Sequence, residues 1–405
     1  MDSASAAGPG SWRRLFLAAL VGSASIGSIG MHLFVPAIPF ITREFASDPT
    51  VTQLALSLSM VAMAVATIAY GPLSDRWGRR VALNGGLALF LLGTVASALA
   101  PDVETLILGR IIQAAGGAAG MVVTRAIVRD VYGPQRAASL MAYLTMAMLV
   151  APMFAQNLGG FLTDNVGWRW GFWLAAACAL LVGLLTGRGM PETHTGPRVS
   201  VSPLTLLRNY GRLLRSPMFG GYALHSAFAA ATFFAFMGAA PALMIETLGR
   251  PALDYSAWFI SLTLTFLLAN ALAGRISTRF GIGPMVWLGG LVSLAAAVVM
   301  VLVILAWGLS PYTLFFPTAI VGVGNGLSMP SANAGAINVD PTLAGTAAGL
   351  AAFLTMALSA VFAQLAAQWA DGTAWPLTGL ILGGTIVSVA AGALPWWLHR
   401  RVQPE

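Results

Sequence analysis

Charged residues occur in short clusters along this chain, and long apolar segments separate the clusters. The stretch 280–339 shows this pattern most clearly, because it contains no Asp, Glu, Lys or Arg and is interrupted only by the sequence AWGLSP near residue 308. A bilayer core requires about 20 apolar residues per helix, so this stretch predicts two membrane-spanning helices joined by a tight turn. The same pattern predicts twelve spans in all, near residues 15–40, 51–73, 81–101, 105–128, 137–161, 169–188, 217–241, 255–274, 284–308, 312–335, 345–368 and 375–398.

The composition independently indicates a polytopic integral membrane protein. The chain is 58% hydrophobic and 9% charged, with a mean hydropathy of +0.80, whereas about 25% of the residues of an average soluble protein are charged. The first residues, MDSASAAGPG, lack a positively charged region, and the apolar segment after them is too long for the core of a signal peptide. The first span is therefore expected to remain as a helix.

The positions of the basic residues predict the orientation of the chain. All 21 are arginines, and with alternating loops sixteen fall on one side of the membrane, whereas only Arg43, Arg169 and Arg250 fall on the other. This bias follows the positive-inside rule and predicts that both termini lie in the cytoplasm. The net charge of +7 is thereby explained by topology, so it does not indicate a nucleic-acid partner.

The longest polar connection divides the predicted spans six and six. The expected segments are a cytoplasmic tail at 1–14, a six-helix bundle at 15–188, a central cytoplasmic loop at 189–216, a second six-helix bundle at 217–398 and a cytoplasmic tail at 399–405. The loop sequence GPLSDRWG at 71–78 aligns with GRISTRFG at 274–281, which indicates that the halves are related. Such repeats predict two bundles with a substrate site between them near the middle of the membrane.

Several segments resemble a known family. GPLSDRWGRR at 71–80 resembles the loop signature of the major facilitator superfamily, and RIIQAAGG at 110–117 resembles its fourth-helix Arg-x-x-Gln motif. Other segments are similar to the drug-resistance branch of bicyclomycin and chloramphenicol exporters (Bcr/CflA type), namely VPAIP at 35–39, TRAIVRDVYG at 124–133, APMFAQNLGG at 151–160, WRWGFW at 168–173, MPET at 190–193 and NGLSMPSANA at 325–334. The resemblance implies an all-α major facilitator fold with twelve transmembrane helices in two pseudo-symmetric bundles, in a monomer of the bacterial inner membrane.

The loop after the second span is a candidate conformational gate. Glycines at 71 and 78 are expected to permit a tight turn that the arginines hold at the cytoplasmic face. Asp75 is either a surface carboxylate paired with those arginines or, as the resemblance implies, a partner of the amino end of the eleventh helix, which would begin after Asp340. The residues assigned to the gate are Gly71, Asp75, Arg76, Gly78, Arg79, Arg80, Arg129 and Asp130.

Arg110 is the costliest predicted membrane residue. It lies six residues after Glu104, about 9 Å deeper at 1.5 Å per residue, and a charge near the bilayer centre costs about 2.5–3.5 kcal/mol. Its side chain either snorkels to the outer surface or, with Gln113 one turn away, faces a central cavity that binds substrate or couples to protons.

His32 occupies a position where relatives in the drug-exporter branch often carry Asp, seven residues before the second Pro of a Pro-x-x-Pro sequence. No span of the first half contains Asp or Glu in its interior, so the usual proton carrier is missing. Histidine changes charge near physiological pH and can replace it, although a lone histidine on an apolar face can equally be a hydrogen-bonded packing group. The two interpretations of His32 are a cavity residue and a packing residue.

The fifth span contains Pro152, Gly159 and Gly160, small or kinking residues that let helices approach closely. The segment resembles the packing motif of antiporters among the facilitators, in which it seals the periplasmic side against the eighth helix. A second Pro expected in that motif is replaced by Gln156, which Asn157 follows, so two polar groups are expected near the cavity or the helix seam.

The second half again lacks a buried carboxylate. Its predicted cavity residues are His225, Phe236, Asn325 and Asn333, among further phenylalanines and tryptophans. An aromatic and weakly polar cavity suits hydrophobic or amphipathic small molecules better than sugars, which need many hydrogen-bonding groups.

The sequence predicts a transporter that is not an enzyme. It contains no catalytic constellation, metal-ligand cluster or nucleotide-binding loop, and its single cysteine, Cys178, cannot form a disulfide within the chain. The leading hypothesis is a secondary active exporter of drug-like molecules that exchanges them for protons and requires no cofactor. The alternative is a facilitator or importer of a small metabolite without the usual proton coupling. A membrane enzyme or signalling scaffold is disfavoured, because the loops are too short to form another domain.

Overall fold

The computed structural model describes residues 9–190, 192–193 and 203–402, and these residues form helices joined by short turns. Parts of the two predicted tails and of the central loop, together with residue 191 of the MPET segment, lie outside this range. Each predicted span from the second to the twelfth overlaps a helix or a segment of a helix, and the first is divided between two helices.

The first half consists of seven helical elements. They are α1 (Pro9–Phe34), the 3-10 turn η1 (Val35–Ala37), α2 (Ile38–Glu44), α3 (Pro49–Trp77), α4 (Arg79–Ala98), α5 (Val103–Asn165) and α6 (Arg169–Gly189). The predicted first span is thus broken at η1, because Pro36 and Pro39 lack the N–H groups that would continue the ladder of α1.

α5 contains both the fourth and the fifth predicted spans. Arg110 and Gly159 contact the same short stretch of α1, at Gly30 and Leu33 respectively. A straight helix would separate these two α5 residues by about 74 Å, so the chain must reverse within α5. Its two membrane-length segments, Val103–Tyr132 and Tyr143–Asn165, therefore run antiparallel, and the predicted polar loop between them is helical.

The second half begins with a helix that the sequence pattern did not predict. This helix is α7 (Pro203–Leu214), within the central loop. The elements after it are α8 (Pro217–Ala242), the π-helical turn η2 (Leu243–Thr247), α9 (Ala252–Phe280), α10 (Ile282–Trp307), α11 (Pro311–Asn338), the 3-10 turn η3 (Pro341–Leu343), α12 (Ala344–Gln368) and α13 (Trp375–Val402).

Among the described residues, eleven helical segments are long and apolar enough to cross a membrane. The predicted span 312–335 is not among them, although α11 is 28 residues long. Its sequence includes Pro317, Pro330 and Asn325, which lower its hydropathy relative to the other spans. α11 packs against α8, α9 and α10, so these less apolar residues lie in a helix with neighbours on several sides.

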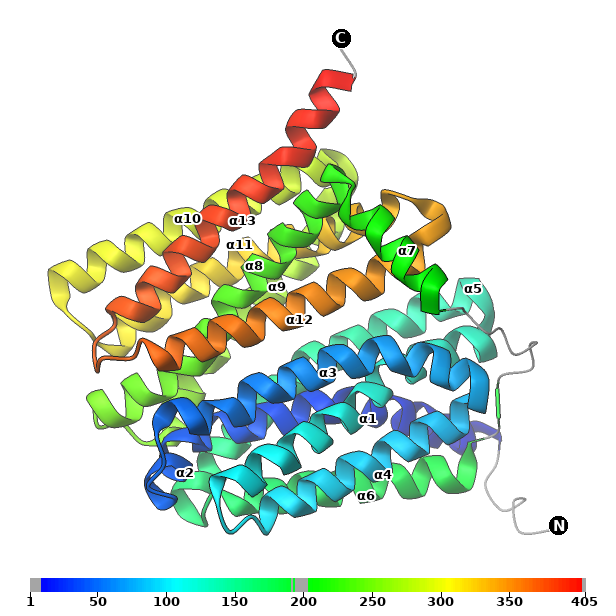
Figure 1. The fold of residues 1–405 in the computed structure, drawn as a ribbon, viewed down its shortest axis with the longest axis horizontal. Coiled ribbons are helices and arrows are strands. Elements are labelled where there is room, and N and C mark those ends of the chain that lie inside the picture. Colours follow the sequence, from blue (N-terminus) through cyan, green and yellow to red (C-terminus); the bar gives the residue numbers. More distant parts are fainter. Residues whose placement is uncertain (1–8, 191, 194–202, 403–405) are drawn as a thin grey trace.

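The helices form two groups (Figure 1). The groups meet where α3 packs against α12 and where α5 packs against α9. The first group contains α1 to α6, and the second contains α8 to α13. α3 and α12 converge where α3 begins and α12 ends, and they diverge toward the other end (Figure 1). We call the end of convergence the Arg-poor end and the opposite end, which carries the turn between α3 and α4, the Arg-rich end.

Two adjacent glycines of α5 make the close contacts at the Arg-poor end. A Cβ at Gly159 would lie 2.5 Å from the carbonyl oxygen of Leu33 on α1. One at Gly160 would lie 2.4 Å from Ser256 Oγ and 2.8 Å from the carbonyl oxygen of Ala252, both on α9. The fifth span therefore packs against the eighth, as the resemblance implied, and no side chain larger than hydrogen fits at this seam.

Replacing Gly160 by Ala should lower the free energy of unfolding by about 1–3 kcal/mol, because the added methyl group overpacks the contact with α9. Thermal unfolding of the purified protein in detergent measures the effect as a lower melting temperature. The matched control is Gly183→Ala on α6, where a Cβ would meet no atom within 4 Å. Equal melting temperatures for the two variants would contradict the close packing of α5 on α9.

Candidate functional site

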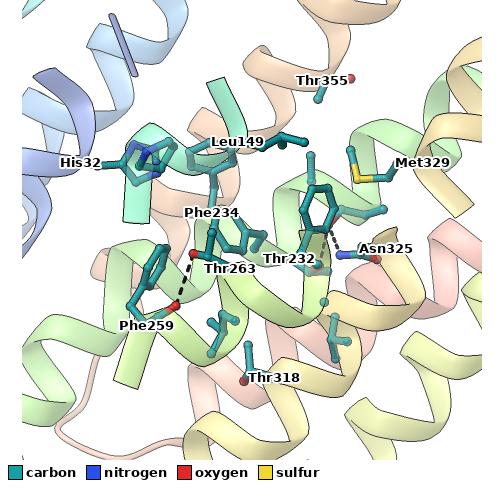
Figure 2. Close-up of a pocket in the computed structure, with 18 of the residues that line it drawn as sticks. His32, Leu149, Thr232, Phe234, Phe259, Thr263, Thr318, Asn325, Met329 and Thr355 are labelled. Carbon is teal, nitrogen blue, oxygen red and sulfur yellow. Dashed lines mark hydrogen bonds between the residues drawn. The ribbon is translucent and has the colours of Figure 1, made fainter. Parts of the chain in front are cut away.

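A cavity of about 250 Å³ lies where the two groups of helices face each other. α8, α9, α11, α12 and α13 form most of its wall. The first half contributes only His32 of α1 and Met148, Leu149 and Pro152 of α5. Figure 2 shows His32 on one side of this cavity and Asn325 with Met329 on the other.

His32 reaches the cavity from the last turns of α1. Its Nδ1 lies 2.9 Å from the carbonyl oxygen of Ser28, one turn earlier in the same helix. Because a carbonyl can only accept, Nδ1 must carry the proton, which leaves Nε2 as the second polar atom of the ring. The ring also packs at 6.2 Å from the ring of Phe259 on α9, so the side chain touches both halves of the protein.

Asn325 reaches the cavity from α11. Its Nδ2 donates to the carbonyl oxygen of Ala229 on α8 at 3.0 Å, and its Oδ1 lies 3.1 Å from the hydroxyl of Ser293 on α10. The amide thus ties three helices together while one face of it lines the cavity. Both residues were predicted to line the cavity, His32 from the position at which relatives in the drug-exporter branch often carry Asp and Asn325 as a polar residue in an apolar span.

The remaining wall is apolar apart from threonine hydroxyls. Its large side chains include Phe233, Phe234 and Phe259, and methionines lie beside them. The four threonines of the wall and its methionines were not predicted, because both residue types occur throughout these spans without a distinguishing pattern. The four threonines are Thr232, Thr263, Thr318 and Thr355.

Arg110 does not snorkel, because the side chain is 2% exposed. Its Nη1 donates to the carbonyl oxygen of Gly30 at 3.0 Å and to Gln113 Oε1, and Gln113 Nε2 donates to Thr94 Oγ1 at 2.8 Å. The guanidinium also lies 4.4 Å from the ring centre of Phe34. Arg110 and Gln113 thereby join α1, α4 and α5 behind the cavity wall, and neither lines the cavity.

Five other predicted cavity residues also lie outside its lining. Gln156 is fully buried, and Asn157 Nδ2 donates to the Met153 carbonyl of its own helix at 2.9 Å. His225 Nδ1 donates to the carbonyl of Ser388 at 2.9 Å, which joins α8 to α13. Phe236 packs edge-on at 5.2 Å from Phe315, and Asn333 is exposed.

Hydrogen bonds and an ion pair join the two groups of helices at the Arg-poor end. Asp164, at the end of α5, accepts from the backbone N–H groups of Ala252 and Leu253 at 3.1 and 2.7 Å. A carboxylate at the N-terminus of α9 is favourably placed in the field of that helix. Further contacts are Arg43 with Glu246 at 3.8 Å, Gln53 Nε2 with the Ala363 carbonyl at 3.3 Å and Ser57 Oγ with Gln364 Oε1 at 2.7 Å.

At the Arg-rich end, Arg79 is the centre of a charge cluster within the first half. Its Nη1 pairs with Asp75 at 2.6 Å, and its Nε pairs with Asp130 at 3.0 Å. The Glu192 carboxylate accepts from the backbone N–H groups of Arg79 and Arg80 at 2.8 and 3.2 Å, so it caps α4. No role was predicted for Glu192, although the MPET segment that contains it resembles the exporter branch.

The other predicted gate residues, two glycines and three arginines, do not take part in the ion pairs of Arg79. Gly78 has a φ of +98°, which favours glycine, but Gly71 lies inside α3, and a Cβ there would meet no atom within 4 Å. The expectation that Gly71 shapes the turn is therefore wrong, because α3 continues to Trp77. The exposed residues Arg76, Arg80 and Arg129 surround the cluster.

The amino end of the eleventh spanning helix has its own partner. Asp340 caps η3 by accepting from Thr342 N at 3.1 Å, and it pairs with Arg212 of α7 at 2.8 Å. The hydrogen bond from the Thr342 hydroxyl, followed by the backbone bond and Arg212, lowers the pKa of Asp340 below its usual value. In this conformation Asp75 pairs with Arg79 on its own loop.

Comparisons with known proteins agree with this architecture. The sequence profile of the Major Facilitator Superfamily matches residues 16–364. Multidrug resistance protein D of Escherichia coli is 28% identical over 369 residues, covering 90% of this chain and 92% of that protein. A chloramphenicol resistance protein of Pseudomonas aeruginosa is 28% identical over 378 residues, covering 91% of this chain and 89% of its own.

A solved structure shares the fold. It is a bacterial homolog of the human lysosomal transporter Spinster in an inward-facing and occupied conformation, with a TM-score of 0.76 at 18% identity over 96% of this chain and 97% of that one. The family match covers most of the sequence, from the first span to the end of the eleventh. This chain therefore belongs to the major facilitator superfamily, a family of multi-pass membrane transporters of small molecules that are not enzymes.

Proposed function

We propose that this protein exports small hydrophobic or amphipathic drug-like molecules across a bacterial inner membrane in exchange for protons. The observation that carries the proposal is the apolar cavity between the two groups of helices. The similarity to resistance proteins over about nine-tenths of the chain supports export of such compounds. The protein acts as a monomer, the default state of this fold.

The mechanism is alternating access between two bundles. The sixteen-to-three arginine bias supports a cytoplasmic location of the Arg-rich end, and in this proposal the contacts at the Arg-poor end close the periplasmic side. Substrate then binds from the cytoplasm in the conformation described above. Opening to the periplasm requires that Asp164 leave the N-terminus of α9 and that the cytoplasmic ends of the bundles approach each other.

Coupling to protons is assigned to His32. It is an ionisable side chain of the cavity wall, and it contacts both halves. Arg110, held behind the wall with Gln113, contributes a fixed positive charge to the same region of the first half. The alternative function, a facilitator or importer without proton coupling, is favoured by the absence of Asp and Glu from the interiors of the predicted spans.

Uptake by inverted membrane vesicles tests the proposal. Inversion exposes the Arg-rich end to the medium, so we expect vesicles that contain the protein to accumulate uncharged aromatic compounds and to lose this accumulation when an uncoupler is added. Vesicles from cells without the protein provide the control. Uptake that is insensitive to the uncoupler would favour the facilitator, and no transport across a diverse panel would refute the export of drug-like molecules.

His32→Asn should abolish gradient-driven accumulation while downhill exchange of the same compound continues. Asparagine can still donate to the Ser28 carbonyl, but it cannot take up a proton in the physiological range. The two rates are measured in the same proteoliposomes, with and without an imposed pH gradient. Undiminished accumulation driven by the gradient would remove His32 from the coupling mechanism.

Asp164→Asn should weaken periplasmic closure, because it removes the negative charge at the N-terminus of α9. The fraction of open protein is expected to rise about twofold to fivefold. The measurement is the rate at which a membrane-impermeant thiol reagent, applied from the Arg-poor side, labels Thr263→Cys in a Cys178→Ala background. Asp102→Asn is the control, since Asp102 accepts from Thr105 N within its own helix at the same end. A rate equal to that of the control would contradict the proposed closure.

A further inference from the structure

Two glutamines at the Arg-poor contact of α3 with α12 have partners across that contact. Gln53 Nε2 donates to the Ala363 carbonyl at 3.3 Å. Gln364 Nε2 donates to the Thr50 carbonyl at 2.9 Å, and Gln364 Oε1 accepts from the Ser57 hydroxyl at 2.7 Å. Both polar atoms of Gln364, a side chain of the second group of helices, are therefore bonded to residues of the first group.

A third glutamine lies at the other contact between the groups, where α5 packs against α9. Gln156 is fully buried, and neither polar atom of its amide has a hydrogen-bond partner among the described residues. It lies four residues after Pro152, which lines the cavity, and four residues before Gly160, which packs against Ser256. Residues four apart share one face of a helix, so Gln156 lies on the face of α5 that meets α9, between the cavity and the Arg-poor end.

The α9 side of this seam carries a second polar group without a partner. Tyr255 is fully buried, and its hydroxyl has no hydrogen-bond partner in the described part of the chain. The hydroxyl lies beside the Gln156 side chain, but the two groups do not reach hydrogen-bond geometry. The Tyr255 ring packs at 6.2 Å from Phe259 and at 6.1 Å from Phe315. Even one bond between the amide and the hydroxyl would leave the N–H groups or the carbonyl of Gln156 unpaired.

Unpaired polar atoms make a buried conformation less favourable. A buried donor or acceptor without a partner has lost its hydrogen bonds to water and has gained none in return. Opening of the seam toward the Arg-poor end would admit water to Gln156 and Tyr255 and restore those bonds. Opening of the contact of α3 with α12 would instead break the two bonds of Gln364. Gln156 and Gln364 therefore act on the closed conformation in opposite directions.

Resting on the proposed alternating access, we propose that Gln156 and the Tyr255 hydroxyl promote opening of the seam between α5 and α9, whereas Gln364 holds the contact of α3 with α12 closed. None of the three lines the cavity, so they act on the equilibrium between conformations and not on the substrate. The antiporter motif that this segment resembles has a proline in place of Gln156, so the resemblance did not imply this role.

The same substitution at two glutamines tests the proposal. Methionine resembles glutamine in length but lacks the amide, so Gln156→Met removes unpaired groups and Gln364→Met removes two hydrogen bonds. The readout is the rate at which a membrane-impermeant thiol reagent, applied from the Arg-poor side, labels Thr263→Cys in a Cys178→Ala background. We expect Gln156→Met to lower this rate about threefold or more and Gln364→Met to raise it about threefold or more.

Further variants connect the change in rate with the seam. Tyr255→Phe removes the second unpaired group and should lower the rate in the same direction as Gln156→Met. The control is Asn157→Leu, which removes the neighbouring amide of α5, because Asn157 donates within its own helix to the Met153 carbonyl at 2.9 Å. Each variant is also labelled from the Arg-rich side, where retained labelling shows that the protein is folded.

The outcomes separate this inference from the proposed function. Faster labelling of Gln156→Met from the Arg-poor side would overturn the inference, because the amide would then hold the seam closed. Unchanged rates in both Gln156→Met and Tyr255→Phe would overturn it as well. The assay needs no substrate, so neither result bears on what is exported. If no variant, including Gln364→Met, is labelled from the Arg-poor side, the alternating access on which the inference rests is refuted.

Discussion

The structure depends on one constraint: within a bilayer, polar groups must find partners inside the protein. Serine and threonine hydroxyls meet it by donating to carbonyls of their own helices, as Thr94 and Thr385 do. The Arg110 guanidinium meets it with neutral partners alone, a carbonyl, an amide and an aromatic face. Among the described residues, the buried side-chain polar atoms without a partner belong to residues outside the cavity lining, for example the hydroxyls of Ser226 and Ser359.

At the Arg-poor end, the two groups of helices share one buried apolar cluster, and a few small polar contacts add to it. Gly160 packs against Ser256, the Asp164 carboxylate accepts from two backbone N–H groups of α9, and Arg43 forms an exposed ion pair with Glu246. Surface ion pairs contribute about 0–1 kcal/mol, and a charge at a helix N-terminus contributes about 0.3–1 kcal/mol. Contacts of this size can be broken and remade in each cycle. By contrast, Arg110 is buried within one group and holds its helices together throughout.

Much of the fold could be predicted because charge spacing is nearly sufficient to locate spans. The pattern did not predict α7, since a short amphipathic helix in a polar loop has no long apolar run, nor the helical reversal inside α5. His32 was predicted as a cavity residue because relatives in the drug-exporter branch often carry Asp at its position, and Asn325 because it is a polar residue in an apolar helix. Arg110 was also an exception, but it bonds to Gly30 of α1 and to Gln113, which in turn bonds to Thr94 of α4, and the sequence does not say which helices meet. The threonines of the wall were missed because threonine occurs throughout these spans without a distinguishing pattern.

The absence of carboxylates from the cavity wall also determines what charge would move in a transport cycle. A carboxylate carrier changes between negative and neutral states, whereas His32 would change between neutral and positive states. Protonation of His32 would therefore create a positive charge, which the fixed positive charge of Arg110 repels. An uncharged substrate contributes no charge of its own. Exchange of one such molecule for one proton would therefore carry a net positive charge inward, and the membrane potential would add about 2.3 kcal/mol per 100 mV to the driving force. With an uncharged substrate, both the pH difference and the membrane potential would drive the exchange. With a singly charged cationic substrate exchanged for one proton, no net charge would move and only the pH difference would drive it.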